Sequence, residues 1–246
     1  MAPTVDGSEL RAELARVTLE VYERYAVEVV ERFGFCPWAR ASRESGEVTL
    51  RVVFSEDRDD FEESIQHLSE LHGQAPGTDI ALFIYPLLDL DRLGFEGYVR
   101  RLRAHAKAGS ARGLRRLDDF AMAAFHPSAN ADLSDPDRLV PYVRRTPDPT
   151  LQLVRNSALS GIKGLSQGTA FLDVAALTLE GLRALQEPPP KAVRERIAEQ
   201  NLATVRATGT PAIDAVLSDI ARQREAGHEA LLARYGRRGP RRQDPG

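Results

Sequence analysis

The sequence predicts an α/β protein with a small sheet of three or more strands, flanking helices and a helical C-terminal extension. In the first half of the chain, short apolar segments alternate with longer amphipathic ones, which is typical of helices packed on a sheet. The second half has mostly helical patterns. Hydrophobic residues make up 42% of the 246 residues. This fraction is enough to fill a core and excludes a wholly disordered chain.

The N-terminal element is predicted to be a helix over residues 8–32. Ser8 is a candidate N-cap, and Gly34 is a candidate end because helices commonly stop at glycine. The apolar residues recur at steps of three and four positions: Leu10, Leu14, Val17, Val21 and Tyr25. A short second helix is expected from Pro37 to Gly46, because proline is favoured at the first helical position.

Three apolar segments are predicted to be strands of one sheet: residues 48–54, 79–85 and 120–125. The first alternates apolar and polar side chains. The second is almost continuously apolar, as expected of a strand that is covered on both faces. Amphipathic helices are predicted between the strands, over residues 57–72 and 90–108, the latter with breaks at Gly94 and Gly97.

The remainder is predicted to be a loop followed by helices. Residues 129–149 are rich in Asp, Ser and Pro, which favours a loop. Helices are expected over residues 149–158, 169–186, 191–207 and 211–235, with a stiff proline linker at 188–190. We therefore expect an α/β core over residues 1–165, a helical extension over 166–235 and a disordered basic tail over 236–246. The sequence leaves open whether the extension packs on the sheet.

Composition excludes several classes of protein and site. The single cysteine excludes a disulfide framework and a thiolate-built metal site, and His67 and His72 do not share a helix face, so no metal site is expected. No apolar run approaches the roughly 18 residues of a membrane span, so no membrane partner is expected. Without an apolar signal region at the N-terminus, we expect a cytoplasmic location.

The basic residues near the C-terminus do not predict a nucleic-acid partner. Seven arginines follow Ile220, but no recognised nucleic-acid module accompanies them, so nucleic acid is not an expected partner. The sequence indicates neither a cofactor nor an oligomeric state.

Cys36 is the first candidate functional residue. If Pro37 begins a helix, Cys36 is its N-cap, where free N–H groups and the helix dipole stabilise a thiolate. The alternative is a small buried side chain packed between Phe35 and Trp38. Trp38 is itself a candidate substrate-binding residue.

His126, Arg144 and Arg145 are the other candidates. His126 follows an apolar strand, at the edge where open α/β sheets bind ligands, so it is a candidate acid/base. The alternative is a capping histidine bonded to the loop that follows. Arg144 and Arg145 precede Asp148-Pro149, which has the pattern of a helix start, and they are candidate anion anchors. The alternative is that they pair with aspartates of the same loop: Asp132, Asp135 and Asp137.

Topology predicts that these candidates line one cleft. In a right-handed crossover a helix runs antiparallel to the strand that follows it, which places Cys36 near the carboxyl ends of the strands. His126 lies at that end of its own strand, and the segment with Arg144 and Arg145 leaves the same edge. A shared site at this edge is therefore expected.

Three motifs occur in order along the chain: Cys36-Pro37-Trp38-Ala39, Ala124-Phe125-His126-Pro127, and the segment from Arg145 to Arg155. Together they resemble the bacterial family of unknown function called DUF1415, over roughly residues 27–158. The chain departs from the family pattern at residues 128–131, at Gln152, where the family has histidine, and at Arg144, where it has asparagine. The resemblance implies that the motif residues belong together, but it implies no reaction.

Three functional hypotheses follow. The first is a small-molecule enzyme with Cys36 as thiolate nucleophile, His126 as acid/base and Arg145 as anion anchor, because thiol chemistry needs a base and charge stabilisation. The alternative is a non-catalytic module that binds an anionic metabolite through Arg144, Arg145 and His126. The third is a helical interaction protein acting through residues 191–235. An oxidoreductase of the two-cysteine type is excluded, because no resolving cysteine is present.

Overall fold

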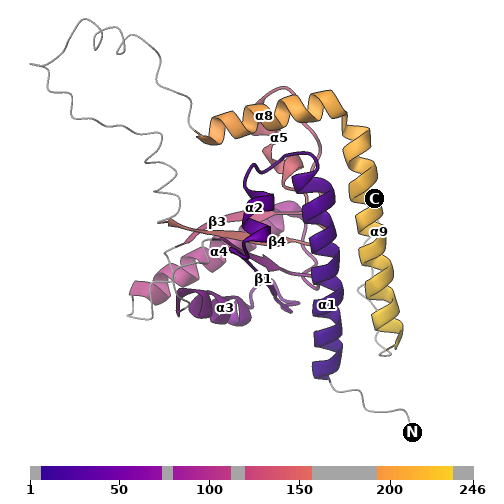
Figure 1. Ribbon diagram of the computed structural model, residues 1–246. Coiled ribbons are helices and arrows are strands. Elements are labelled where there is room, and N and C mark those ends of the chain that lie inside the picture. The colour runs from indigo at the N-terminus through magenta and orange to yellow at the C-terminus, as the bar shows by residue number, and fades with distance from the viewer. Residues whose placement is uncertain (1–6, 74–79, 112–119, 157–192, 235–246) are drawn as a thin grey trace, which may run out of the picture.

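A computed structural model describes residues 7–73, 80–111, 120–156 and 193–234 (Figure 1). Its centre is a four-stranded mixed sheet with the strand order β1-β2-β4-β3. The strands are β1 (Val48–Val52), β2 (Ile80–Ile84), β3 (Phe120–Phe125) and β4 (Thr150–Arg155). Helices flank this sheet, so the predicted α/β fold class and the three predicted strands are confirmed, and the sheet contains one further strand.

The topology brings three strand ends and one strand start to the same edge. β1 and β2 are parallel, whereas β4 is antiparallel to both of its neighbours, so β3 runs in the same direction as β1 and β2. Thr150, the first residue of β4, pairs with Ile84 at the end of β2 and with Phe125 at the end of β3. We call this the carboxyl edge of the sheet.

The predicted helix over residues 149–158 is wrong, because residues 150–155 form the strand β4. Leu151 and Leu153 are fully buried, and Gln152 between them is half-buried, which is the period of two that a strand requires. Strands on both sides satisfy the backbone hydrogen bonds of the segment. Pairing with distant strands therefore decides the conformation of this short sequence.

The predicted loop over residues 129–149 is also wrong in part, because it contains the helix α5 (Pro136–Val143). Asp135 caps this helix: its carboxylate accepts a hydrogen bond from the Asp137 N–H at 2.8 Å. Pro136 occupies the first turn, where its missing N–H has no consequence. Leu139 and Tyr142 bury the inner face. The aspartate and proline that suggested a loop thus begin a helix.

The remaining helices agree closely with the sequence pattern. The N-terminal helix α1 (Gly7–Tyr25) continues as a π-helix, η1 (Ala26–Glu31), and Gly34 follows with a φ of +65°. The others are α2 (Ala39–Glu44), α3 (Glu62–Gly73), α4 (Arg92–Ala111), α8 (Val193–Thr208) and α9 (Thr210–Arg234). Helix α4 runs unbroken through both glycines at which breaks were expected. The predicted helix at 169–186, the linker at 188–190 and the basic tail at 236–246 lie outside the described residues.

Each face of the sheet has its own hydrophobic core. On one face Phe83, Leu151 and Leu153 pack with apolar residues of α3 and α4. On the other face Leu50, Leu82 and Ile84 pack with residues of α1, α5, α8 and α9. Strand β2 contributes to both cores, which explains its almost continuous apolar sequence.

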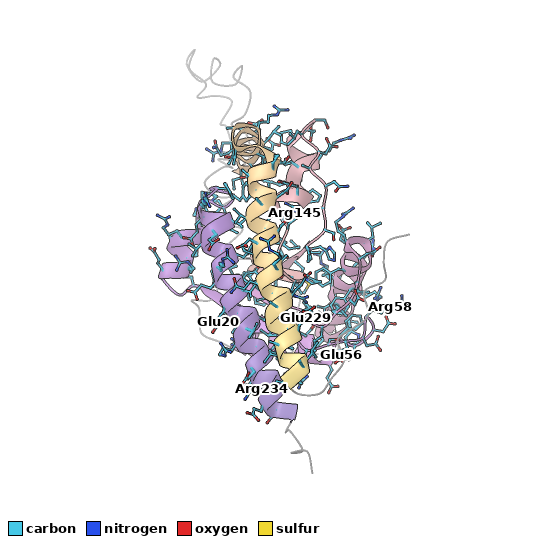
Figure 2. All side chains as sticks on the ribbon, turned by 90° about the vertical axis from the view of Figure 1, so that its right-hand side faces the viewer. Glu20, Glu56, Arg58, Arg145, Glu229 and Arg234 are labelled. Carbon is cyan, nitrogen blue, oxygen red and sulfur yellow. The ribbon has the colours of Figure 1, made fainter. Side chains whose placement is uncertain are left out.

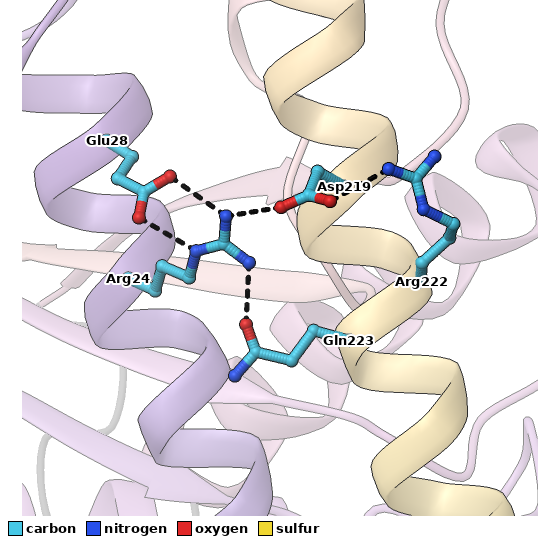
Figure 3. A network of polar contacts seen from close by, with 5 residues as sticks. All are labelled: Arg24, Glu28, Asp219, Arg222 and Gln223. Atoms are coloured by element: carbon cyan, nitrogen blue, oxygen red, sulfur yellow. Dashed lines mark hydrogen bonds and ion pairs between the residues drawn. The ribbon is translucent and has the colours of Figure 1, made fainter.

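The C-terminal helices pack on the rest of the protein. Figure 1 shows α9 alongside α1 and α8 above α5. Between α1 and α9, the Arg24 guanidinium donates to Glu28 at 2.8 Å, to Asp219 at 2.5 Å and to Gln223 at 2.7 Å (Figure 3). Asp219 also accepts from Arg222 at 2.8 Å. Within the described ranges, no helix is long and apolar enough to cross a membrane.

Candidate functional site

The loop before β4, residues 144–149, is hydrogen-bonded to the carboxyl edge of the sheet. The His126 N–H donates to the carbonyl of Arg144 at 3.3 Å, and the Tyr85 N–H donates to that of Pro149 at 2.9 Å. Inside the loop, the hydroxyls of Thr146 and Thr150 both donate to the carbonyl of Asp148, at 2.7 and 2.9 Å. This loop leads into a strand, so the expectation that Asp148 caps a helix is wrong, although the loop does lie at the predicted edge.

Both ring nitrogens of His126 are hydrogen-bonded. Nε2 lies 2.9 Å from the carbonyl of Leu90, and because a carbonyl only accepts, Nε2 carries the proton. Nδ1 accepts from the N–H of Ser128 at 3.1 Å. The residue is 9% exposed. These bonds fix the orientation of the ring and join the end of β3 to the segment just before α4 and to the following turn.

His126 and Arg144 line a small cavity of about 60 Å³, which we call the Arg144 pocket. Its other walls come from α4, β3 and α5: Arg92, Glu96, Ala124, Val140 and Pro141. Arg92 is paired with Glu96 at 2.5 Å. The Arg144 guanidinium stands 5.3 Å from the centre of the Phe125 ring, and no carboxylate of the described residues pairs with it. Burial lowers the pKa of Arg144, and the like charge of Arg194 lowers it further.

Arg145 does not line this pocket, and its side chain reaches α9 (Figure 2). Its guanidinium pairs with Asp214 of α9 and lies 4.3 Å from the centre of the Tyr142 ring. The Tyr142 hydroxyl also hydrogen-bonds Asp214, at 3.1 Å. The Nε atom of Arg145 is buried, and no residue in the described ranges hydrogen-bonds it.

The alternative interpretation expected Arg144 and Arg145 to pair with aspartates of the preceding loop. Neither arginine does so. Those carboxylates have other partners in the structure. Asp132 binds Ser134 and Arg138, Asp135 caps α5, and Asp137 pairs with Arg194 at 3.1 Å.

Cys36 and Trp38 lie in the turn between η1 and α2. Helix α2 begins at Ala39 with Trp38 as its N-cap, so the expectation that Cys36 is an N-cap is wrong. Cys36 is a free thiol of intermediate exposure, and its carbonyl accepts from the Ala39 N–H at 3.2 Å. The side chain of Trp38 is 43% exposed. Trp38 lines a cavity of about 330 Å³ between this turn and α8, which we call the Trp38 pocket.

The five predicted site residues thus fall into three groups. His126 and Arg144 share the Arg144 pocket, and Trp38 lines the Trp38 pocket, which has no residue in common with it. Cys36 and Arg145 line neither of these pockets, but both interact with Tyr25. Burial raises the pKa of Tyr25, the Arg145 guanidinium opposes that rise, and Cys36 adds to it. One cleft for all five residues stays a prediction.

Sequence reasoning missed a buried polar cluster under α1 and α9. The Asp148 carboxylate is 1% exposed and accepts from Arg224 of α9 at 2.7 Å, and burial raises its pKa while Arg224 lowers it in part. Arg224 also donates to the carbonyl of Pro86 at 2.9 Å. Tyr22 hydrogen-bonds Thr150 beside Asp148, and burial raises its pKa. In the sequence, Arg224 has the pattern of an ordinary surface arginine on a helix, so no local signal predicts that it pairs with Asp148.

Comparison with known protein families gives a match over much of the chain. The family model described as a protein of unknown function, DUF1415, matches residues 19–167. No curated protein and no solved structure matches the chain. The matched region contains all three ordered motifs and runs from the middle of α1 through the whole sheet, past the end of β4, to residue 167. Because this match covers more than half of the chain, the protein belongs to the DUF1415 family.

Proposed function

We propose that the protein binds a small anionic metabolite through the Arg144 pocket. The observation that carries this proposal is a half-buried guanidinium with no carboxylate partner among the described residues, at the wall of a cavity. A half-buried guanidinium without a carboxylate gains a charge-assisted hydrogen bond from an anion, so a ligand carboxylate or phosphate is the natural partner for Arg144. A cavity of about 60 Å³ has room for such a group.

The surroundings of the pocket favour an anion over a cation. Arg92 forms part of the wall, and Arg194 is near enough to Arg144 to lower its pKa. Glu96 is the one carboxylate among the lining residues, and Arg92 already pairs with it. His126 supports the pocket as a fixed wall, because both of its ring nitrogens are used by the protein.

The test is the effect of anions on stability. In phosphate or malonate, the melting temperature of the protein should be higher than in chloride at the same ionic strength. The reason is that a ligand present at ten times its Kd adds about 1.4 kcal/mol to the free energy of unfolding. The substitution Arg144→Gln should abolish the rise. Arg138→Gln is the matched control, because Arg138 is exposed on α5, the helix that ends just before Arg144. Equal responses in the two variants would refute the proposal. Native mass spectrometry of the purified protein would show a ligand retained from the cell.

The enzyme hypothesis has weaker support. It needs a free base, but His126 would first have to break a bond to Leu90 or Ser128. It also needs a reactive thiol, and no helix N-terminus supports Cys36. The favourable observation is that Cys36 and Arg145 both interact with Tyr25. The rate of Cys36 alkylation against pH decides between the hypotheses: a midpoint well below that of a free thiol favours the enzyme.

A further inference from the structure

We propose that helix α9 controls anion binding at the Arg144 pocket, and that Asp214 is the positioning residue through which it does so. This inference rests on the proposed function, because it concerns the regulation of the same site. Asp214 is not among the residues that line the pocket, but it binds two residues beside them. Helix α9 lies beyond the family match, so the coupling belongs to a part of the chain that the family model does not include.

The C-terminal end of α5 and the two residues that follow it are shared between the pocket and α9. The residues on the pocket side are Val140, Pro141 and Arg144. Tyr142 and Arg145, which are interleaved with them in the sequence, both bind Asp214. The Tyr142 hydroxyl donates to Oδ1 of this carboxylate at 3.1 Å, and the Arg145 guanidinium pairs with the same oxygen. One carboxylate of α9 therefore holds the turn of chain that forms a wall of the pocket.

The backbone hydrogen bonds of this turn are long. The Arg144 N–H donates to the carbonyl of Val140 at 3.2 Å, and the Arg145 N–H donates to that of Tyr142 at 3.3 Å. The Arg144 carbonyl accepts from the His126 N–H, also at 3.3 Å. Backbone bonds are most often about 2.9 Å long, so these three hold the turn less firmly than usual. The side-chain contacts to Asp214 therefore contribute to fixing the position of Arg144.

Helix α9 is anchored well enough to serve as this support. Ile213, next to Asp214, is fully buried in the same core as Leu139 and Tyr142. Further along α9, Arg224 pairs with the buried Asp148 at 2.7 Å, near the other end of the loop that begins at Arg144. A displacement of α9 therefore moves both ends of this loop, and the anion affinity of the pocket changes with it.

Such coupling acts in both directions. If docked α9 raises the affinity of the pocket for an anion, a bound anion favours docked α9 by the same factor. Phosphate should therefore slow amide hydrogen exchange around Asp214 more than in α3, which packs on the opposite face of the sheet. The difference should be absent in Arg144→Gln. A residue that only stabilised the fold would not produce this local effect.

The substitution Asp214→Asn tests the coupling on the full chain, with phosphate affinity measured by NMR titration of the amide signals. It should weaken phosphate binding about fivefold or more, the usual size of coupling between sites. Removing a negative charge by itself strengthens anion binding, so a weaker affinity identifies lost positioning of Arg144.

Asp219→Asn is the matched control for charge and stability. Asp219 lies on the same helix and pairs with Arg24 of α1 in place of the loop. The side chains of Asp214 and Asp219 are 45% and 48% exposed, so losing either ion pair should lower the melting temperature by a similar amount. Only Asp214→Asn should weaken phosphate binding.

Tyr142→Phe is a second test that leaves the charge unchanged. It removes one of the two groups that Asp214 binds, so it should also weaken phosphate binding. Tyr85→Phe is its control, because the Tyr85 hydroxyl bonds Ser64 of α3 at 3.0 Å and has no part in the contact with α9. It should leave the phosphate affinity as in the wild type.

The outcomes separate this inference from the proposed function. If the wild type binds no phosphate, or Arg144→Gln binds it equally well, the proposed function is refuted and the inference with it. If binding depends on Arg144 but is as strong in Asp214→Asn as in Asp219→Asn, only the inference is overturned. Should Asp214→Asn fail to fold, the comparison of Tyr142→Phe with Tyr85→Phe decides in the same way.

Discussion

His228, on α9, is a histidine that the folded protein keeps uncharged. Burial and, to a smaller extent, the charge of Arg224 lower its pKa from 6.5 to about 4. Its Nε2 is buried without a hydrogen-bond partner among the described residues. Between pH 6.5 and 4 the unfolded chain therefore binds more protons at this residue than the folded protein does. The contribution of His228 to stability is present above pH 6.5 and is lost as the pH falls toward 4.

The substitution His228→Gln should flatten the pH dependence of stability. The wild-type free energy of unfolding should fall by up to about 3 kcal/mol from this residue between pH 7 and pH 4, and the variant should lack that component. Urea denaturation at several pH values measures it. His105→Gln is the control, because His105 is exposed on α4. A variant with the same slope as the wild type would show that His228 is readily protonated in the folded state.

At the scale of elements, the close approach of α1 and α9 depends on Gly227. A Cβ at this position would lie 2.7 Å from Cγ1 of Val17, and valine in a helix has one strongly preferred rotamer, so the contact is not easily relieved. The Arg24 network between the same helices is partly exposed and contributes at most about 1 kcal/mol. We therefore expect packing, more than ion pairing, to set the distance between the helices.

Gly227→Ala should destabilise the protein although alanine is the better helix former. The overpacked contact costs about 1–3 kcal/mol, against a gain of about 1 kcal/mol in helix propensity. Gly97→Ala in α4 is the control: its Cβ would meet only arginine side chains, at 3.6 Å or more, so it should stabilise the protein by up to about 1 kcal/mol. In a background of Val17→Ala, Gly227→Ala should become stabilising. Thermal and urea unfolding measure the wild type and the four variants, which are Gly227→Ala, Gly97→Ala, Val17→Ala and the double variant. Stabilisation by Gly227→Ala alone would contradict the prediction.

The elements also show where sequence reasoning succeeds. The helices α1, α8 and α9 and the strand β2 have long or strongly apolar patterns, and local sequence predicts them well. β4 has an alternating pattern over only three residues, Leu151 to Leu153, and its conformation is decided by pairing with β2 and β3, which are distant in the sequence. The sequence before β4, Pro147-Asp148-Pro149, is compatible with both a helix start and a buried turn. Interpreting it as a helix start made the predicted element a helix in place of a strand and made Asp148 an N-cap in place of a buried partner of Arg224.

The candidate site, too, could be predicted only in part from the sequence. The position of His126 at the end of a strand and of Arg144 at the same edge could be predicted, because topology follows from the order of elements. Their partners could not, because the Arg145–Asp214 and Asp148–Arg224 pairs join residues about 70 positions apart in the chain. Such pairs form only when α9 packs on the sheet.

At the scale of the whole molecule, the C-terminal helices complete a structure that the family match does not include. The match ends at residue 167, whereas Asp214 and Arg224, which hold the loop at the carboxyl edge, lie on α9. The same helix buries Ile213, Ile220 and Leu231. At about 1.5–3 kcal/mol for each buried side chain, these three contribute roughly 5–9 kcal/mol, comparable to the total stability of a typical domain.

A chain ending at residue 192 should therefore fail to unfold cooperatively. It would expose the apolar faces of α1 and α5 and leave the Asp148 carboxylate without Arg224. Near-ultraviolet circular dichroism and thermal unfolding measure the loss. A chain ending at residue 235 is the control: residues 236–246 are mostly Arg, Gly and Pro, so its melting temperature should change little. A shorter chain that unfolds cooperatively at the wild-type temperature would show instead that the α/β core folds without α8 and α9.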